Sequence, residues 1–128
     1  MPTVSPPPPT RVLLVDDQRA ILVGVGALID SEAPRMRVVG HADCGRRALE
    51  LAGATQPDLI VLDADLAGED GLALIPLLRS RCDAAIVVFT CLAEPRVRLR
   101  ALRLGAAGFV SKTASGDELI AAIRGATG

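Results

Sequence analysis

The sequence predicts a single α/β domain with a parallel sheet that is covered by helices on both faces. Short aliphatic runs alternate along the chain with segments of helical length, and the connections between them are short. The chain has 128 residues, half of them hydrophobic, which suits one domain with one substantial core. We find no internal repeat and no second domain.

Five aliphatic runs are expected to form strands. They are Val12–Val15, Met36–Ala42, Leu59–Leu62, Ala85–Phe89 and Gly108–Ser111. The first run is apolar throughout, as in a strand that is buried on both faces. Pro57 precedes the third run and disfavours a helix there.

Five further segments have helical length. They are Arg19–Asp30, Cys44–Ala54, Asp70–Arg79, Pro95–Leu104 and Gly116–Ala126. We expect Asp70 and Ser115 to cap the third and last helices, and Pro76 to interrupt the third. Pro95 suits a first helical turn, and Gly105 suits a helix end.

Residues 1–10 contain five of the nine prolines. We expect this leader to be extended or disordered and to lie outside the fold, with the domain covering residues 11–128. A polyproline ligand for another protein is the alternative interpretation of this segment.

Composition excludes several classes of function. The net charge of −1 gives no argument for nucleic acid or for an anionic membrane surface. The apolar stretches are shorter than the roughly 20 residues that span a bilayer, and the N-terminus lacks the features of a signal peptide. Three cysteines without metal spacing indicate reduced thiols and a cytoplasmic location. A single histidine, His41, argues against a histidine zinc site or a Ser-His-Asp triad.

Polar side chains follow four of the predicted strands. Asp16 and Asp17 follow the first strand, Asp63 the third, Thr90 the fourth and Lys112 the fifth. Because parallel strands open their carboxyl ends onto one crevice, we expect these side chains to meet. Clustered carboxylates repel one another unless a cation joins them. Carboxylate oxygens together with water suit Mg²⁺, so the sequence predicts a magnesium site.

Lysine and threonine extend this cluster toward phosphoryl chemistry. The Lys112 ammonium can pair with phosphate oxygens, and the Thr90 hydroxyl can donate to one. A carboxylate that attacks phosphorus needs this kind of positioning and charge neutralisation. Taken singly, each residue has a simpler interpretation as a helix cap, a turn residue or a solvated lysine. The combination at four strand ends favours a common site.

Segments around these residues resemble the receiver domain of two-component response regulators, from about Arg11 to Gly125. The matching segments are Leu14-Val-Asp-Asp17, Pro57-Asp-Leu-Ile-Val-Leu-Asp63, Asp70-Gly71, Val88-Phe-Thr90 and Gly105-Ala-Ala-Gly-Phe-Val-Ser-Lys112. The last segment and the ending Asp117–Arg124 resemble the NarL/LuxR-type subgroup of transcriptional regulators. The resemblance implies a flavodoxin-like (βα)5 fold with sheet order 2-1-3-4-5.

The resemblance also implies residue roles. Asp63 would be the phosphoacceptor and would bind Mg²⁺ as well. Asp17 would bind the metal directly, Asp16 through water, and Asp65 through its backbone carbonyl. Lys112 would pair first with Asp63 and then with the phosphoryl group.

The same resemblance implies a switch and a set of partners. Thr90 would move toward the phosphoryl group, and Phe109 would be its aromatic partner. A sensor histidine kinase would supply the phosphoryl group, so the protein would be a phosphoacceptor, with self-dephosphorylation as its one enzyme-like property. The output would be transcription through a DNA-binding domain outside this chain, which we expect to be part of a longer protein. A homodimer through the first and last helices is a further expectation.

Four positions depart from the common receiver pattern. Ala67 and Thr113 stand where proline is frequent, which predicts a looser loop after Asp63 and a trans peptide after Lys112. Cys91 replaces a smaller residue and would crowd the phosphoryl path. Phe109 lacks a hydroxyl, so its switch would operate by packing alone.

Two other functions fit part of the pattern. Asp63-Ala-Asp65 could act as the nucleophile and acid of a small haloacid-dehalogenase-type phosphatase, although Asp16 and Asp17 would then be unexplained. A degenerate receiver could signal without phosphate. Arg96, Arg100 and Arg103 form a basic stripe on the fourth predicted helix, either a solvated face or a signalling contact.

Overall fold

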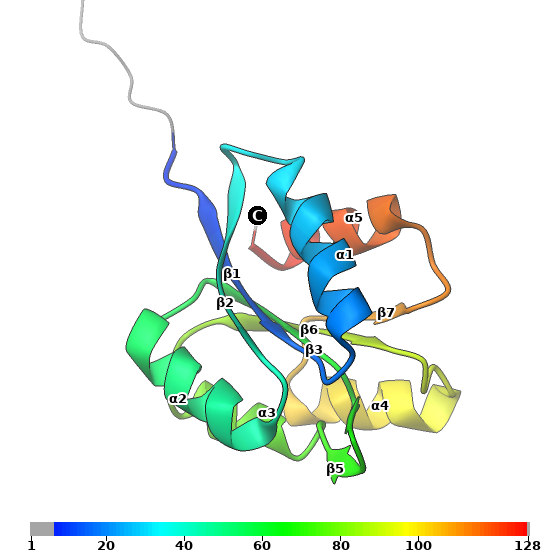
Figure 1. The fold of residues 1–128 in the computed structure, drawn as a ribbon. Helices are drawn as coiled ribbons and strands as arrows, with labels where there is room; N and C mark the ends of the chain where they lie inside the picture. Colours follow the sequence, from blue (N-terminus) through cyan, green and yellow to red (C-terminus); the bar gives the residue numbers. More distant parts are fainter. Residues whose placement is uncertain (1–6, 128) are drawn as a thin grey trace, which may run out of the picture.

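The computed structural model describes residues 7–127, and its centre is a five-stranded sheet (Figure 1). The strands are β1 Thr10–Val15, β2 Met36–Ala42, β3 Leu59–Leu62, β6 Ala85–Thr90 and β7 Gly108–Ser111. Every neighbouring pair is parallel, and the order is β2-β1-β3-β6-β7. When only these five strands are numbered along the chain, this order is the expected 2-1-3-4-5.

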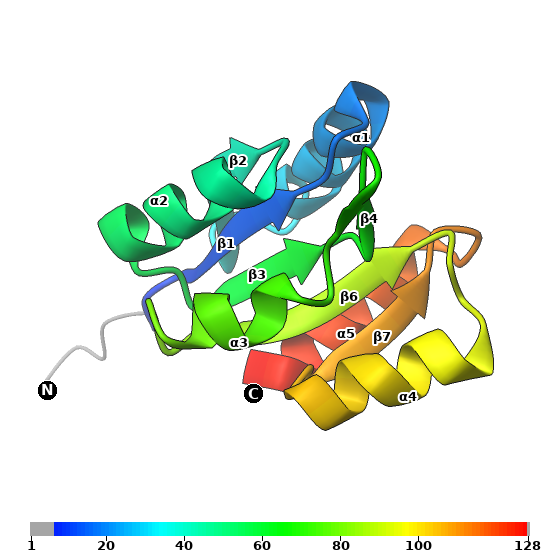
Figure 2. The same ribbon diagram turned by 90° about the horizontal axis from the view of Figure 1, so that it is seen from below.

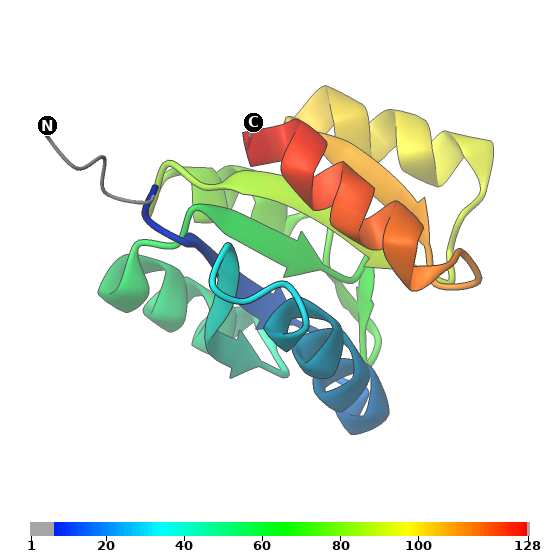
Figure 3. The ribbon, with the colours of Figure 1, turned by 90° about the horizontal axis from the view of Figure 1, so that it is seen from above.

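Five helices cover the two faces of the sheet. They are α1 Arg19–Asp30, α2 Gly45–Thr55, α3 Leu74–Arg79, α4 Pro95–Leu104 and α5 Gly116–Thr127. Figure 2 shows α2, α3 and α4 on one face, and Figure 3 shows α1 and α5 on the other. The sheet therefore separates two apolar layers, and successive residues of a strand contribute to opposite layers.

The strand residues divide between these layers in strict alternation. Leu13 and Val15 of β1 pack with the α2, α3 and α4 side chains, whereas Val12 and Leu14 pack with α1 and α5. Burial on both faces explains why Val12–Val15 of β1 and the whole of β3 are aliphatic. The predicted α/β class and aliphatic core are confirmed.

The first strand begins at Thr10, two residues before the predicted start at Val12 and one residue inside the predicted leader. Thr10, assigned to the leader from the sequence, pairs with Met36 of β2, and its N–H donates to the Arg35 carbonyl at 2.7 Å. Residues 7–9 have no regular secondary structure. Residues 1–6 of the predicted leader lie outside the described residues, as does residue 128.

Helix α3 is shorter than the predicted Asp70–Arg79. Asp70 does cap the turn, since its Oδ1 accepts the N–H groups of Leu72 and Ala73, but regular helix starts only at Leu74. Pro76 lies in the first turn of α3 and does not interrupt it, because an N–H in that turn has no partner within the helix. The cap predicted at Ser115 is confirmed by its Oγ, which accepts the Glu118 N–H at 3.3 Å.

The loop between β3 and α3 folds into a two-stranded hairpin of β4 Asp65–Leu66 and β5 Glu69–Asp70. Its turn residues, Ala67 and Gly68, both have positive φ, at 54° and 87°. Positive φ at both central residues is the geometry of the tight two-residue turns that favour Asn-Gly. The loop thus contains a regular turn, and the expectation that it is looser than with proline at Ala67 stays a prediction.

Gly71 lets this hairpin return against the sheet. Its N–H donates to the Ala64 carbonyl at 2.8 Å. A Cβ at this position would lie 1.9 Å from the Asp63 carbonyl oxygen, so only glycine fits. The hairpin is thus packed directly against the backbone of Asp63.

Among the helices of residues 7–127, none is both long and apolar enough to cross a membrane.

The turn of the hairpin gives a stability prediction. Ala67→Asn should raise the free energy of unfolding by up to about 1 kcal/mol, because asparagine tolerates the left-handed conformation better than alanine. Urea unfolding followed by circular dichroism measures the change. Gly68→Ala, one residue on, should lower stability, because its φ of 87° strains any side chain. A lower stability for Ala67→Asn would contradict the strain assigned to this turn.

Candidate functional site

The predicted polar side chains meet at the carboxyl edge of the sheet, with Asp63 at their centre. The Asp63 side chain follows β3 and is 5 % exposed. Its Oδ1 accepts the Thr90 hydroxyl at 2.7 Å and the Asp65 N–H at 3.1 Å. Its Oδ2 accepts Lys112 Nζ at 2.7 Å. Three donors from three different segments therefore converge on one carboxylate.

The hydrogen bonds of the sheet fix the backbone positions of these residues. Asp63 N–H donates to the Val15 carbonyl, and Lys112 N–H donates to the Thr90 carbonyl, both at 3.0 Å. Asp16 N–H donates in the same way to Ala42. The residues just past the strands thus remain tied to neighbouring strands, which holds their side chains over the same crevice.

Asp16, Asp17 and Asp63 form an acidic group at this edge. One carboxylate oxygen from each lies within 4.8 Å of the others. Asp16 and Asp63 are buried, whereas Asp17 is exposed. This arrangement of hard oxygen ligands with one open side can hold a divalent cation that keeps part of its water.

Lys112 is the cation that balances the buried carboxylates. Besides Asp63, its Nζ contacts Asp16 Oδ2 at 2.8 Å, and the lysine side chain is only 5 % exposed. Burial lowers the pKa of Lys112, but hydrogen bonds with Asp16 and Asp63 outweigh this effect, so the pKa is raised overall. Burial raises the pKa of Asp16 and outweighs the hydrogen bonds from Lys112 and the Gln18 N–H, which lower it.

Gln18 is a member of the site that the sequence interpretation missed. Its Oε1 accepts Lys112 Nζ at 2.9 Å. The position directly after Asp16-Asp17 was the available signal, but glutamine in a loop has many simpler explanations. Throughout residues 7–127, every buried side-chain nitrogen or oxygen has a hydrogen-bond partner, so the site is fully satisfied.

The hairpin beside Asp63 is held on two sides. Glu69 Oε2 accepts the Gly45 N–H at the start of α2, at 3.3 Å. Asp70 accepts both Arg100 terminal nitrogens of α4, at 3.1 and 2.8 Å. The Arg100 guanidinium holds the pKa of the Asp70 carboxyl below its ordinary value. Helices α2 and α4 are thereby connected to the segment that follows Asp63.

This contact adds detail to the basic stripe on α4. Arg100 pairs with Asp70 within the chain, and Arg96 pairs with Glu94 at 3.2 Å. All three arginines of the stripe are exposed, so the predicted solvated face is confirmed, with two of them in surface ion pairs. Whether Arg103 and Arg96 serve a signalling contact stays a prediction.

Phe109 lies on β7, beside β6. It is partly buried against the core layer of α2, α3 and α4, opposite Val88 of β6. Thr90 is two residues further along β6 and therefore faces the same layer. Cys91 is exposed. A threonine–phenylalanine switch is compatible with this placement and stays a prediction, as does crowding by Cys91.

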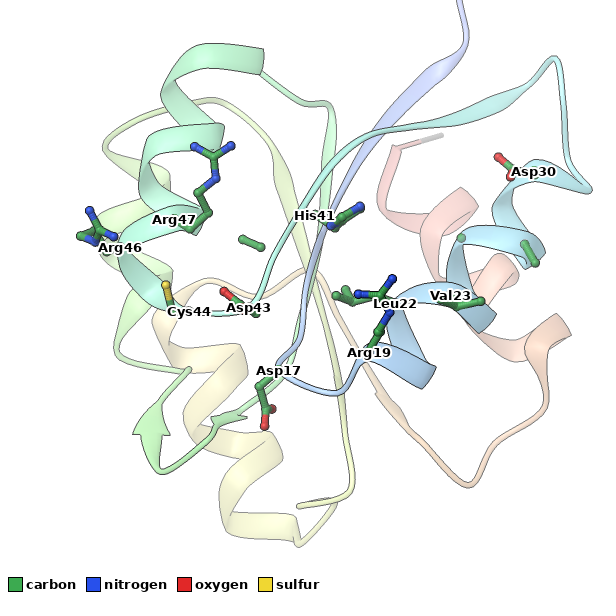
Figure 4. Close-up of a pocket in the computed structure, with 13 residues that line it drawn as sticks. Asp17, Arg19, Leu22, Val23, Asp30, His41, Asp43, Cys44, Arg46 and Arg47 are labelled. Atoms are coloured by element: carbon green, nitrogen blue, oxygen red, sulfur yellow. The ribbon is translucent and has the colours of Figure 1, made fainter.

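A separate groove of about 870 Å³ runs between α1 and the start of α2 (Figure 4). His41 lines it from the exposed surface of β2, as expected for a strand residue that faces solvent. Asp17 is the residue that this groove shares with the acidic group. The acidic group and the groove are thus adjacent and meet at Asp17.

The sequence of residues 12–124 matches the family model of the response regulator receiver domain. The chain belongs to this family. The family and the fold that the sequence predicted are both confirmed. The chain is the receiver domain of a two-component response regulator. This family consists of phosphoacceptor regulators rather than enzymes in the usual sense.

Individual relatives agree with this assignment. The chain is 37 % identical to response regulator GacA of Pseudomonas aeruginosa over 115 residues, which cover 89 % of this chain and 53 % of GacA. It thus spans about half the length of the curated relatives it matches. The receiver domain of the putative response regulator NarL from Mycobacterium tuberculosis superposes with a TM-score of 0.83 at 34 % identity, covering 92 % of this chain and 95 % of that one.

A third relative is a response regulator protein from Burkholderia pseudomallei, solved with a phosphorylated aspartic acid, a calcium ion and citrate. It shares 28 % identity with a TM-score of 0.80 and covers 89 % of this chain and 66 % of that one.

The charge balance at Lys112 gives a prediction on stability. Lys112→Met should lower the free energy of unfolding by up to about 3 kcal/mol without metal, because Asp16 and Asp63 lose their buried counterion. Millimolar Mg²⁺ should then stabilise the variant more than the wild type, because the metal no longer competes with an ammonium. Thermal unfolding with and without Mg²⁺ measures both effects. Arg103→Met, which removes an exposed cation, is the control, and equal Mg²⁺ shifts in all three proteins would contradict the counterion role.

The Arg100–Asp70 contact gives a prediction on pH. Arg100→Met should cost less than about 1 kcal/mol of stability at neutral pH, because both side chains are half exposed and screened by solvent. A lowered pKa of Asp70 means that the pair stabilises the fold fully above about pH 4, the ordinary value. The difference from wild type should therefore vanish as the pH falls through the lowered pKa. Urea unfolding at pH 7 and pH 3 tests this, and a difference that grows toward pH 3 would reverse the sign.

Proposed function

We propose that Asp63 accepts a phosphoryl group from a sensor histidine kinase and that the resulting change of surface controls an output. The observation that carries this proposal is the convergence of Thr90, Lys112 and the Asp65 N–H on the Asp63 carboxylate. A carboxylate so positioned, beside two further aspartates, has the groups that phosphoryl transfer uses.

The acidic group fits Mg²⁺ as its cofactor. Asp17 would bind the metal directly, Asp16 through water, Asp63 through its carboxylate and Asp65 through its backbone carbonyl. The hard oxygens of the acidic group, one side of which is open to solvent, support this assignment. When bound, Mg²⁺ would neutralise charge on the phosphoryl oxygens.

The residues of the chain then have distinct tasks. An Asp63 oxygen attacks phosphorus, a P–O bond forms, and the P–N bond to the kinase histidine breaks in line with it. The Lys112 ammonium pairs with a phosphoryl oxygen and offsets its charge. Thr90, which donates to Asp63 Oδ1 at 2.7 Å before transfer, donates to a phosphoryl oxygen afterwards.

Movement of the Thr90 hydroxyl is the start of the proposed switch. It opens space on the α4 side of the sheet, where Phe109 can repack. Phosphorylation acts through such local charge and packing changes when a surface has two arrangements. Because Phe109 lacks a hydroxyl, packing alone would transmit the change.

The relatives support a transcriptional output. One relative, 37 % identical over 116 residues, is a putative transcriptional regulator of Pseudomonas aeruginosa, and the chain spans about half of its length and of GacA. We propose a DNA-binding output domain outside this chain, a cytoplasmic location, and homodimerisation through α1 and α5, which lie side by side on one face (Figure 3). The phosphorylated aspartic acid and calcium ion of the Burkholderia pseudomallei relative support a metal-assisted phosphoaspartate here.

Two observations argue against the haloacid-dehalogenase-type phosphatase. Asp65 Oδ1 accepts the Gly68 N–H at 2.9 Å and so belongs to the hairpin turn rather than to an acid/base position. Asp16 and Asp17 also lie at the site, where that reaction leaves them without a role. The complete set of ligands argues against a degenerate receiver.

Beryllofluoride with Mg²⁺ tests the proposal as a mimic of the phosphoryl group. The wild type should bind it and Asp63→Asn should not, because beryllium needs a carboxylate oxygen. The chain has no Trp or Tyr, so ¹⁹F NMR or calorimetry is suitable and intrinsic fluorescence is not.

Asp65→Asn is the matched control. It removes the side-chain charge but keeps the backbone carbonyl, so beryllofluoride binding should persist. Incubation with acetyl phosphate should add one phosphoryl group by mass to the wild type and to Asp65→Asn. Equal beryllofluoride binding by wild type and Asp63→Asn would overturn the proposal, and steady turnover of a phosphomonoester that Asp65→Asn abolishes would restore the phosphatase.

A further inference from the structure

We propose that Gln18 is a positioning residue that keeps Lys112 at the phosphoryl site when a divalent cation takes over the carboxylates that Lys112 now contacts. The proposal rests on the proposed phosphoacceptor function. It concerns an amide that is neither a metal ligand nor a reacting group, and it acts only through the lysine.

The geometry gives Lys112 three acceptors of two kinds. Asp63 Oδ2, Asp16 Oδ2 and Gln18 Oε1 lie 2.7, 2.8 and 2.9 Å from its Nζ. An ammonium has three donors, so this set satisfies it completely. Two of the acceptors are charged and belong to the acidic group, whereas the third is neutral and does not.

A divalent cation would compete with Lys112 for the charged acceptors only. Asp16 and Asp63 are the residues that Lys112 shares with the acidic group. The cation would also repel the ammonium, whose flexible four-carbon stem can carry it toward solvent. The Gln18 amide oxygen is then the remaining protein acceptor in place, so it holds the lysine where a phosphoryl oxygen would arrive.

The backbone of Gln18 is fixed independently of its side chain. Its N–H donates to Asp16 Oδ1 at 2.9 Å, and its carbonyl accepts the N–H groups of Ile21 and Leu22 in the first turn of α1. The amide is therefore presented from a rigid point between an acidic residue and a helix. Binding of the ammonium therefore has to order only the side-chain torsions of Gln18 and not its backbone.

Gln18 also occupies a helix N-cap, where a different residue type would stabilise the helix more. It is the N-cap of α1, and its side chain makes no capping hydrogen bond within the described chain. Serine, threonine, aspartate and asparagine are preferred at N-caps because their short side chains accept a free helix N–H. Glutamine is directed to Lys112 instead, so helix stability and lysine positioning make opposite demands on this residue.

These opposite demands permit a sharp test with Gln18→Ser. Serine can cap α1 but cannot reach Lys112, so without metal the gain from the cap and the loss of the Lys112 hydrogen bond should offset each other, and the stability should stay close to that of wild type. Its affinity for beryllofluoride at saturating Mg²⁺ should nevertheless fall about tenfold, the scale of one hydrogen bond to a charged group. Its affinity for Mg²⁺ alone should change less than threefold. Calorimetry on the whole chain measures both affinities, and urea unfolding measures stability.

A double-mutant cycle with Lys112→Met shows whether the effect passes through the lysine. The cycle is read in the free energy of unfolding at saturating Mg²⁺, and the gain from capping cancels because both backgrounds share it. We expect Gln18→Ser to be less favourable in the wild type than in Lys112→Met. Equal effects in the two backgrounds would overturn the positioning role.

The remaining outcomes separate this inference from the proposed function. If wild type binds beryllofluoride with Mg²⁺ and Gln18→Ser binds it equally well, the inference fails and the proposed function stands. If the stability and the beryllofluoride affinity of Gln18→Ser fall together, Gln18 has a structural role only. If wild type binds no beryllofluoride, both proposals are overturned.

Discussion

The ion pair of Lys112 with Asp63 and Asp16 is the interaction on which the rest of this structure depends. Two carboxylates lie buried at the carboxyl edge of the sheet, and burial of uncompensated charge would be costly. Lys112 compensates them from the far end of the chain. The same contact joins the beginning, middle and end of the sequence at one point. The Lys112 ammonium therefore allows two carboxylates that repel each other to lie close together in a stable fold.

The parallel sheet makes this contact possible because each strand delivers the residue after it to the same edge. Backbone hydrogen bonds continue past the ends of β3 and β7 to Asp63 and Lys112. The backbone of both residues is therefore held by the sheet. The hairpin after Asp63 is tied to α2 by Glu69 and to α4 by Asp70. A change at Asp63 therefore has two physical connections to helices on the α2–α4 face, of which the α4 contact is exposed and weak enough to rearrange.

Two residues near the site depart from local preferences, and Gln56 does so at the C-cap of α2, away from the site. Ala67 adopts a left-handed conformation that alanine disfavours, and Gln18 occupies a helix N-cap without capping it. Near the site such departures can persist because the rest of the fold supplies the stability that they cost. At Ala67 the tight turn places β5 beside β4, and at Gln18 the amide reaches Lys112.

The sequence by itself determined the α/β class, the five strands and the convergence of Asp16, Asp17, Asp63, Thr90 and Lys112. These features follow from aliphatic periodicity and from the rule that parallel strands share one edge. Other features were decided by tertiary structure. The hairpin at Ala67 and the late start of α3 depend on Gly71 packing against Asp63. Gln18 and Arg100 could not be assigned from sequence, because their partners lie 94 and 30 residues away. Long side chains choose among many acceptors, and only the folded chain decides which one lies within reach.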